Sequence, residues 1–272
     1  MRETTTGGKR PGGAFTPSPA LVVIPTYQEA GTIRAALDAL TAAAPGVHVL
    51  VVDDGSPDGT AELVAAVARE RDGVHLLRRQ GKEGLGSAYR AGFAWGLEAG
   101  YDALVEMDAD GSHDPGSTPA LLAGLRGADL VIGSRYVPGG ATPDWARHRR
   151  YLSTYANRYS SLVLGLPVAD STSGFRAYRA ALLRAVDLDQ VRSSGYAFQI
   201  EMARAAAAAG ARITEVPITF SDRKVGTSKM STAIAVEAFL RVTAWGLTRP
   251  RRRAPFRLQE TGHPPTYFVR SW

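Results

Sequence analysis

The sequence contains no cysteine among its 272 residues. Disulfides, thiolate metal sites and cysteine nucleophiles are therefore excluded, although this absence says little about compartment because disulfides are optional outside the cytosol. No apolar run approaches the roughly 20 residues that a membrane-spanning helix needs. Residues 1–19 include basic residues and many Thr, Gly and Pro, but no apolar signal core. We therefore expect a disordered N-terminal segment on a cytoplasmic protein.

Two nucleotide- and nucleic-acid-binding signatures are also missing. No G-x-G-x-x-G follows the first predicted strand, which speaks against a dinucleotide site. The net charge is +6, and much of the excess lies in two basic clusters at 147–150 and 249–253. Such clusters can meet nucleic acid, anionic lipid or phosphorylated substrates. Because no aromatic residues interleave a basic stripe, we expect no nucleic-acid partner.

The hydrophobic fraction of 44% is ample for the core of one large α/β domain. Short apolar runs alternate with helical patterns through the first half of the chain. Repeated strand–helix units predict a mostly parallel central sheet flanked by helices, with ligands beyond the carboxyl ends of the strands. The predicted strands are 20–25, 47–53, 74–77 and 101–108, and the predicted helices are 29–43, 60–68 and 86–97.

The second half has a less regular pattern. A helix after Pro115 is followed by a strand, a long Gly- and Pro-rich functional loop, a helix, a short strand, a helix and an edge strand interrupted by Pro217. With no internal repeat, we expect one catalytic domain over 20–232, an apolar amphipathic helix over 233–249 and a basic tail over 250–272. The elements after the first helix are predicted at 129–133, 134–150, 151–164, 175–178, 196–209 and 212–220.

The most informative stretch is 104–110, an apolar run that ends in two carboxylates one residue apart. Strand side chains alternate, so Asp108 and Asp110 would point the same way if the strand continued through them. Two oxygen donors at a crevice suit a hard divalent cation that also binds diphosphate oxygens. The alternative is a solvated Asp-rich turn, because Asp, Gly and Ser are ordinary turn residues.

Polar side chains also follow the first two predicted strands. The Tyr27 ring could stack on a base, and Glu29 could accept hydrogen bonds from a base or ribose. The alternative is a helix start, with Thr26 near the cap and Glu29 in the first turn. A carboxylate at the second strand end, in Asp53-Asp54, is placed to accept from ribose hydroxyls or a base N–H.

Taken in order, several motifs resemble the family 2 glycosyltransferases of the GT-A fold. They are VVIPTYQEAGTI, VVDDGSPDGT, GLGSAYRAG, MDADGSHDP, GSRYVPGG, SGFRAYR, GYAFQIEM and EVPITF. Within that family the chain looks most like the polyprenol (dolichyl) monophosphate mannose synthases. The resemblance covers about 20–232 and implies an α/β GT-A nucleotide-sugar-binding fold.

The resemblance also implies roles for the matching residues. Asp108 and Asp110 would hold Mg²⁺ or Mn²⁺, while Asp110 and Arg135 would act in catalysis. Some relatives have glutamine where this chain has Ser112, which leaves water or His113 as the third metal ligand. The acceptor phosphate would be bound by Arg135, Arg149 and Ser153. The nucleotide sugar would be bound by Pro25, Tyr27, Glu29, Val52, Asp53, Asp54, Asp108, Ala109, Asp110, Arg223 and Lys229.

The implied reaction transfers mannose from GDP-mannose to a polyprenyl monophosphate, with inversion at the anomeric carbon. The lipid phosphate is already ionised near pH 7, so no strong general base is required. Two alternatives stay open. One is a polyprenyl-phosphate glucosyltransferase or related synthase, although many of those have C-terminal membrane spans that this chain lacks. The other is a non-catalytic nucleotide-sugar-binding subunit, which would be expected to lose the carboxylates or arginines that this chain keeps.

The apolar helix offers a route to a lipid substrate. Over 233–247 the charged residues are Glu237 and Arg241, and the segment is too short to span a bilayer but can lie in its interface. Trp245 suits the headgroup level, and the basic cluster 249–253 follows. We expect docking at the cytoplasmic membrane face or onto an integral-membrane partner. The alternative is a buried helix packed on the sheet.

Overall fold

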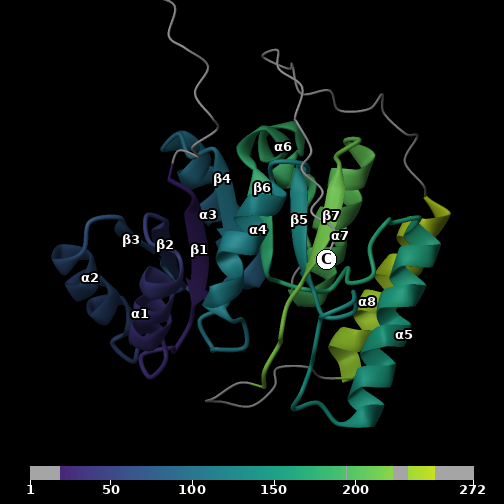
Figure 1. Cartoon of the computed structure of the whole chain (residues 1–272), viewed down its shortest axis with the longest axis horizontal. Helices are drawn as coiled ribbons and strands as arrows, with labels where there is room; N and C mark the ends of the chain where they lie inside the picture. The colour runs from purple at the N-terminus through teal and green to yellow at the C-terminus, as the bar shows by residue number, and fades with distance from the viewer. Residues whose placement is uncertain (1–18, 194, 223–231, 249–272) are drawn as a thin grey trace, which may run out of the picture.

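The computed structural model describes residues 19–193, 195–222 and 232–248. In this part of the chain seven strands form one sheet in the order β3-β2-β1-β4-β6-β5-β7 (Figure 1). Neighbouring strands are parallel except at β6, which is antiparallel to both β4 and β5. The predicted mostly parallel sheet is confirmed. The strands are β1 (Leu21–Thr26), β2 (His48–Asp53), β3 (Val74–Arg78), β4 (Ala103–Glu106), β5 (Leu130–Ser134), β6 (Arg176–Arg179) and β7 (Ile213–Pro217).

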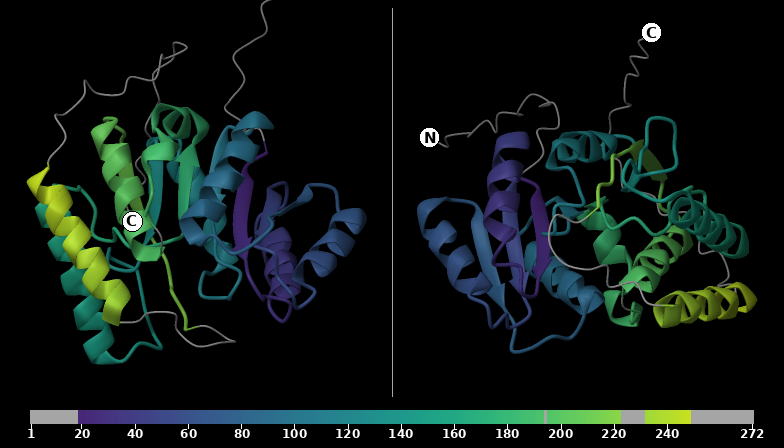
Figure 2. Two further views of the ribbon diagram at one scale, coloured as in Figure 1. Left: turned by 180° about the vertical axis from the view of Figure 1, so that it is seen from behind. Right: turned by 90° about the horizontal axis from the view of Figure 1, so that it is seen from below.

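Helices cover both faces of the sheet (Figures 1 and 2). Alternate residues of β1 enter two separate cores: Leu21 and Val23 pack in the cluster that includes α3 and α7, while Val22 and Ile24 pack with α1, α2 and α4. Burial on both faces explains why the strand reads as a continuous apolar run. The helices are α1 (Ile33–Ala43), α2 (Thr60–Glu70), α3 (Leu85–Glu98), α4 (Thr118–Gly124), α5 (Arg147–Leu164), α6 (Ala180–Ala185), α7 (Gly195–Ala208) and α8 (Thr232–Leu247), with 3₁₀ turns η1 (Pro115–Ser117) and η2 (Leu188–Gln190).

The first helix begins later than the sequence predicted. Thr26 belongs to β1 and donates its hydroxyl to Asp53, so it does not cap α1. Gln28 adopts φ 60°, and the Glu29 backbone N–H bonds to Thr60 Oγ1 at 3.0 Å. The helix-start interpretation of Thr26 and Glu29 is therefore wrong, because this segment turns across the end of the sheet before α1 begins.

Other boundaries also differ from expectation. β4 ends at Glu106, two residues before the predicted end, while α5 begins at Arg147 and so takes the basic cluster 147–150 out of the predicted loop. The edge position indicated by Pro217 is confirmed, because β7 pairs with β5 alone and ends at that proline. The short helix α6 was not predicted. The expected disordered segment, the basic tail and the cluster 249–253 lie outside the described residues, apart from Pro19 at the first boundary.

The C-terminal helix α8 runs alongside α5 at the β7 end of the molecule (Figures 1 and 2). Tyr159 of α5 stacks on Phe239 with ring centroids 4.7 Å apart, and its hydroxyl bonds to Thr243 Oγ1 at 2.7 Å. Val242 is buried, and Trp245 packs against the core below Arg204. One face of α8 therefore packs on α5 and α7, whereas the alternative interpretation placed the helix on the sheet. None of the described helices is long and apolar enough to cross a bilayer.

The close approach of α3 to the sheet gives a stability prediction. A Cβ added at Gly92 would clash with Val23 Cγ1 and lie 3.2 Å from Val52 Cγ2. We expect Gly92→Ala to destabilise the fold by about 1–3 kcal/mol through overpacking, although alanine is intrinsically the better helix former. Urea unfolding measures the change. Gly127→Ala is the matched control, because no atom lies within 4 Å of its added Cβ; equal stability of the two variants would contradict the packing argument.

Candidate functional site

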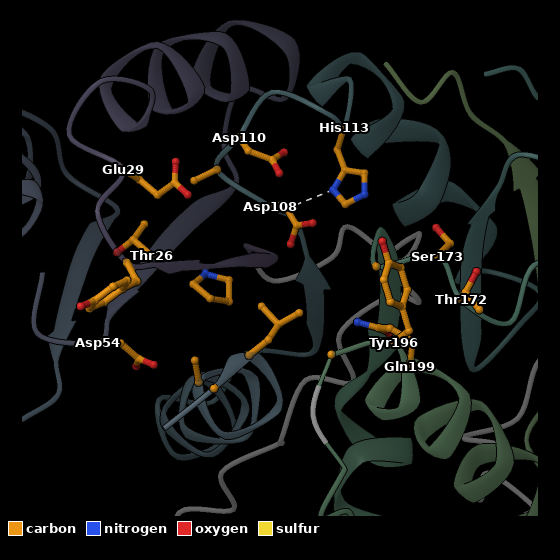
Figure 3. A pocket seen from close by; sticks show the side chains of 18 of the residues that line it. Thr26, Glu29, Asp54, Asp108, Asp110, His113, Thr172, Ser173, Tyr196 and Gln199 are labelled. Atoms are coloured by element: carbon orange, nitrogen blue, oxygen red, sulfur yellow. Dashed lines mark hydrogen bonds between the residues drawn. The ribbon is translucent and has the colours of Figure 1, made fainter. Parts of the chain in front are cut away.

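A pocket opens beyond the carboxyl ends of β1, β2, β4 and β5 (Figure 3). This is the position at which open α/β sheets bind ligands. Its wall combines residues from both halves of the chain, which the fold brings together. The lining residues are Pro25, Thr26, Tyr27, Glu29, Asp54, Lys82, Gly84, Leu85, Ala88, Asp108, Ala109, Asp110, His113, Arg135, Thr172, Ser173, Gly174, Gly195, Tyr196, Gln199 and Phe220.

One end of the pocket has an aromatic ring and a buried carboxylate. Lys82 Nζ lies 4.3 Å from the centroid of the Tyr27 ring. Asp54 pairs with Arg79 at 2.8 Å and also accepts the Glu83 backbone N–H. Burial raises the pKa of Asp54, although Arg79 opposes the rise. The predicted residues Pro25, Tyr27, Glu29 and Asp54 all line this pocket, and an aromatic face with carboxylate acceptors suits a nucleoside.

Two predicted nucleoside contacts lie behind the wall instead. Asp53 is 1% exposed and accepts hydrogen bonds from Thr26 Oγ1, Ser56 N and Ser56 Oγ, so its carboxylate holds the turn after β2. Val52 is fully buried in the core beneath Gly92. β2 continues through Asp53, so neither side chain lines the pocket and the first carboxylate of the lining is Asp54. A contact of Val52 or Asp53 with the nucleotide stays a prediction.

Asp108 and Asp110 both line the pocket, but a turn places them there. β4 has ended at Glu106, and Asp110 Oδ1 accepts the Ser112 backbone N–H at 3.0 Å. Asp108 accepts the Tyr89 hydroxyl at 3.2 Å, and its own N–H donates to His113 Nδ1 at 3.1 Å. The expectation of two carboxylates in one crevice is met. The proposed cause, alternation along a strand, is wrong.

The donor set fits a hard divalent cation bound together with a substrate. Among the residues that the structure describes, no three His, Cys, Asp or Glu side chains form a metal-binding group. Two carboxylates that share their cation with water and diphosphate oxygens are the usual arrangement for Mg²⁺ or Mn²⁺ with a nucleotide. Asp108 and Asp110 are therefore suitable ligands, with the remaining positions open to water and substrate.

His113 is a poor third ligand. Burial lowers its pKa although Asp108 and Asp110 oppose this, which favours the neutral ring. Because Nδ1 accepts the Asp108 N–H, the proton of the neutral ring lies on Nε2. A protonated nitrogen cannot ligate a metal. Ser112 is buried and does not line the pocket, so water is the better candidate.

Arg135 lies in the pocket wall as half of a buried ion pair. Its Nε and Nη2 each lie 2.7 Å from an oxygen of Asp170, and Nη2 also bonds to Thr172 Oγ1. Burial is the largest single influence and would raise the pKa of Asp170, but the charge and hydrogen bonds of Arg135, together with the charge of Arg176, hold that pKa below its usual value. Glu215 accepts hydrogen bonds from the backbone N–H groups of residues 169 and 170. These bonds hold the backbone at Asp170, and so position the Asp170 carboxylate. Much of the Arg135 charge is therefore balanced within the protein.

Arg149 and Ser153 lie on α5 outside the pocket lining. Arg149 pairs with Asp222 at 2.7 Å, and its guanidinium lies 4.1 Å from the Trp145 ring centroid. The Arg135 guanidinium lies 5.3 Å from the same centroid, so one indole contacts both arginines. Ser153 Oγ accepts the Tyr136 hydroxyl at 2.6 Å. The structure thus brings the predicted acceptor residues close to the pocket wall. Arg223 and Lys229 lie outside the described residues.

Sequence reasoning assigned no role to several lining residues, including Lys82, Thr172, Tyr196 and Gln199. It also missed Asp170, whose pairing with Arg135 spans 35 residues. A signal was present for some of them: SGFRAYR and GYAFQIEM are among the motifs of the resemblance, and Gln199 is a polar residue between the apolar Phe198 and Ile200. Spacing alone does not say which of these side chains faces the ligand.

The Arg135–Asp170 pair gives a second prediction. Asp170→Asn should destabilise the fold by about 3–5 kcal/mol at pH 7, because it leaves a buried guanidinium without its counter-charge. The folded-state pKa of Asp170 is lowered, so its contribution is present above the unfolded pKa and is lost as pH falls through the folded pKa. Urea unfolding measures the free energy of unfolding of the variant and of the wild type at pH 7 and near pH 3. The gap between the two proteins should be smaller near pH 3. The control Asp38→Asn disrupts a half-exposed pair with Arg71 and should cost less than about 1 kcal/mol; similar losses in both variants would contradict the assignment.

Relatives and solved structures agree with this geometry. Residues 21–187 match the family model "Glycosyl transferase family 2". The undecaprenyl-phosphate mannosyltransferase of Micrococcus luteus is 53% identical over 84% of this chain and 93% of that protein. The polyprenol monophosphomannose synthase of Mycolicibacterium smegmatis is 50% identical over 84% and 86%.

The fold also matches solved structures at low sequence identity. A mannosyltransferase from Pyrobaculum calidifontis, in complex with GDP-Man and Mn²⁺, superposes with TM-score 0.58 at 17% identity over 90% of this chain and 70% of that chain. Glucosyl-3-phosphoglycerate synthase of Mycobacterium tuberculosis, with Mn²⁺ and UDP, gives 0.59 at 20% identity over 89% and 86%. The predicted GT-A architecture and the resemblance to polyprenol monophosphate mannose synthases are confirmed. The chain therefore belongs to the family 2 glycosyltransferases.

Proposed function

We propose that the enzyme transfers mannose from GDP-mannose to a polyprenyl monophosphate, with inversion at the anomeric carbon. The observation that carries this proposal is the position of Asp108 and Asp110 in one pocket, between Asp54 on one side and Thr172, which bonds to Arg135, on the other (Figure 3). A diphosphate at the two carboxylates has room for a nucleoside on one side and for an acceptor phosphate on the other.

The choice of donor rests on the relatives. The Micrococcus and Mycolicibacterium proteins are both mannosyl-transferring enzymes by name, and both are at least 50% identical to this chain. The Pyrobaculum enzyme with GDP-Man and Mn²⁺ shares the fold. These similarities favour GDP-mannose with Mg²⁺ or Mn²⁺ over the alternative of a glucosyl donor. The two carboxylates and the arginines of the site are present, which favours an enzyme over a non-catalytic subunit.

The chain's own residues have distinct parts in the proposed mechanism. Asp108 and Asp110 would hold the divalent cation, which neutralises charge on the departing diphosphate when bound. Tyr27 and Asp54 would orient the nucleoside, while Arg135 and Arg149, which contact one indole, would bring the acceptor phosphate beside the sugar. The attacking phosphate oxygen is already ionised, so positioning and electrostatic stabilisation supply the catalysis.

The metal assignment is tested by Asp110→Asn, which keeps the side-chain shape but removes one ligand charge. Transfer from GDP-mannose should fall by at least about a hundredfold, the scale of one lost electrostatic stabiliser. The control Asp114→Asn changes an exposed residue of the same loop that lies outside the pocket lining and should retain transfer. Near-normal turnover of Asp110→Asn at saturating Mg²⁺ or Mn²⁺ would refute the assignment.

The acceptor is a lipid, and the paired helices α5 and α8 present an apolar surface. Exposed large apolar side chains lie on both helices, and α5 contains four arginines and one histidine but no acidic residue. Such a surface complements an anionic bilayer. This apolar surface differs from the predicted membrane-docking surface, because Trp245 packs inward and α5 supplies most of the exposed apolar side chains. The exposed residues are Tyr151, Leu152, Tyr155, Leu162, Phe239, Leu240 and Leu247.

Membrane docking through α5 predicts a separable defect. Leu152→Glu with Tyr155→Glu should reduce sedimentation with phosphatidylglycerol vesicles at least about tenfold, because both side chains are more than half exposed and the new charges oppose the anionic surface. Transfer to a short, water-soluble polyprenyl phosphate should persist. Leu63→Glu on α2 is the control for an exposed leucine on another surface. Unchanged vesicle binding would place the contact elsewhere. Location at the cytoplasmic face and an integral-membrane partner stay predictions.

A further inference from the structure

The pocket contains a buried amide that the protein leaves unpaired. Gln199 on α7 is 2% exposed and lines the pocket, as Figure 3 shows. Neither Nε2 nor Oε1 of Gln199 has a hydrogen-bond partner among the described residues. Buried polar groups in native proteins are almost always paired, because an unpaired one has lost its water without compensation. A polar ligand in the pocket would supply hydrogen-bond partners for the Gln199 amide.

Gln199 is also held in a fixed position. Its backbone carbonyl accepts a 2.7 Å hydrogen bond from Nη1 of the fully buried Arg176. The same guanidinium donates to the carbonyls of Ser171 and Ser173, each at 2.7 Å. The first turns of α7 and the segment 171–173 are therefore joined through one side chain. The unpaired amide is a feature of this rigid wall.

The space beside the amide is kept open by a glycine. A Cβ added at Gly174 would lie 3.5 Å from Gln199 Nε2, 3.7 Å from His113 Cε1 and 4.0 Å from Asp108 Oδ2. The amide and one of the two metal-binding carboxylates thus border the same small volume. In the view of Figure 3, Asp54 and Gln199 lie on opposite sides of the pocket, and Asp108 lies above and between them. A donor with its nucleoside at Asp54 and its diphosphate at Asp108 has its sugar on the Gln199 side.

We propose that Gln199 recognises hydroxyl groups of the donor's sugar ring, and that Gly174 leaves the room this ring occupies. The inference rests on the proposed function and names a specificity-determining residue for it. A carboxamide offers two N–H donors and an acceptor oxygen in one plane, so it can pair with adjacent ring hydroxyls. It is neutral and therefore does not compete for the cation or the diphosphate. A site that bonds a hydroxyl rejects analogues that lack it.

A structural role toward Glu106 is the competing explanation. Glu106 is fully buried, accepts the Tyr178 hydroxyl through Oε1 and has an unpaired Oε2. The Gln199 amide lies close enough to favour the ionised form of this carboxyl, although it does not reach hydrogen-bond geometry with it. A purely structural amide would affect folding and would affect GDP and GDP-mannose binding alike. A sugar contact would affect only the ligand that carries the sugar.

Calorimetric titration of Gln199→Leu with GDP and with GDP-mannose, in saturating Mg²⁺, separates the two roles. We expect the GDP affinity to stay within about twofold of the wild type and the GDP-mannose affinity to fall at least about tenfold, the effect of one to two lost hydrogen bonds. The loss of kcat/KM should be similar or larger. Thermal unfolding of each variant checks the fold. Gln190→Leu, the same change at an exposed glutamine outside the pocket, should match the wild type.

Gly174→Ala tests the same volume without touching the amide. Its added methyl would make only ordinary van der Waals contacts, so the variant should fold, yet it would fill the space assigned to the sugar. We expect normal GDP binding and weakened GDP-mannose binding. This variant carries the test if Gln199→Leu fails to fold. A set of GDP-deoxymannoses adds a third measurement: the wild type should discriminate against at least one of them, and Gln199→Leu should lose that discrimination.

The outcomes separate this inference from the proposed function. If Gln199→Leu and Gly174→Ala both retain the wild-type preference for GDP-mannose over GDP, or if either loses GDP affinity equally, Gln199 does not recognise the sugar. If the wild type transfers a different sugar from its nucleotide, the proposed donor is wrong, and the same variants titrated with that nucleotide sugar then decide the role of Gln199.

Discussion

The fully buried guanidinium of Arg176 determines the shape of one side of the pocket. It lies on β6, the antiparallel strand of the sheet, and donates to the carbonyls of Ser171, Ser173 and Gln199. A buried cation is tolerated only when its donors are satisfied and a counter-charge is near. Glu106 on the neighbouring strand is the carboxyl group nearby: burial raises its pKa to about 7, and the Arg176 charge opposes the rise. The same bonds that satisfy the arginine join a loop to a helix, and both line the pocket.

The rest of the site depends on the ends of parallel strands. β1, β2 and β4 end side by side, and each is followed by residues of the pocket wall. Local turns then decide which side chains face inward. The Asp53 carboxylate accepts hydrogen bonds within its own turn, while Asp54 lines the pocket. The hydrogen bond from the Ser112 N–H to Asp110 stabilises the turn that contains the second carboxylate suited to the metal. The sheet determines where the pocket lies, and individual hydrogen bonds in the turns determine which side chains face it.

This division explains how much the sequence could predict. Continuous apolar runs identify strands buried on both faces, so the sheet, the edge position of β7 and the clustering of Tyr27, Asp54, Asp108 and Asp110 follow from pattern and position. The orientation of neighbouring side chains does not, because it changes with the residue at which a strand stops; the Val52 side chain, for example, packs in the core. The partner of a buried charge also cannot be identified from the neighbouring sequence. Nothing near Arg135 indicates Asp170, yet without it the arginine could not be buried.

The helix α5 combines cationic and exposed apolar side chains. Near its first turn α5 contributes Arg149, whose guanidinium shares the Trp145 indole with Arg135 of the pocket wall. Further along, its exposed side is apolar at Leu152, Tyr155 and Leu162, while its other side packs against α8. In the proposed reaction a lipid phosphate would meet cations at one end of this helix, and the membrane surface would lie against the apolar side chains further along. Because α8 packs on both α5 and α7, it joins the helix that carries these side chains to a helix that lines the pocket.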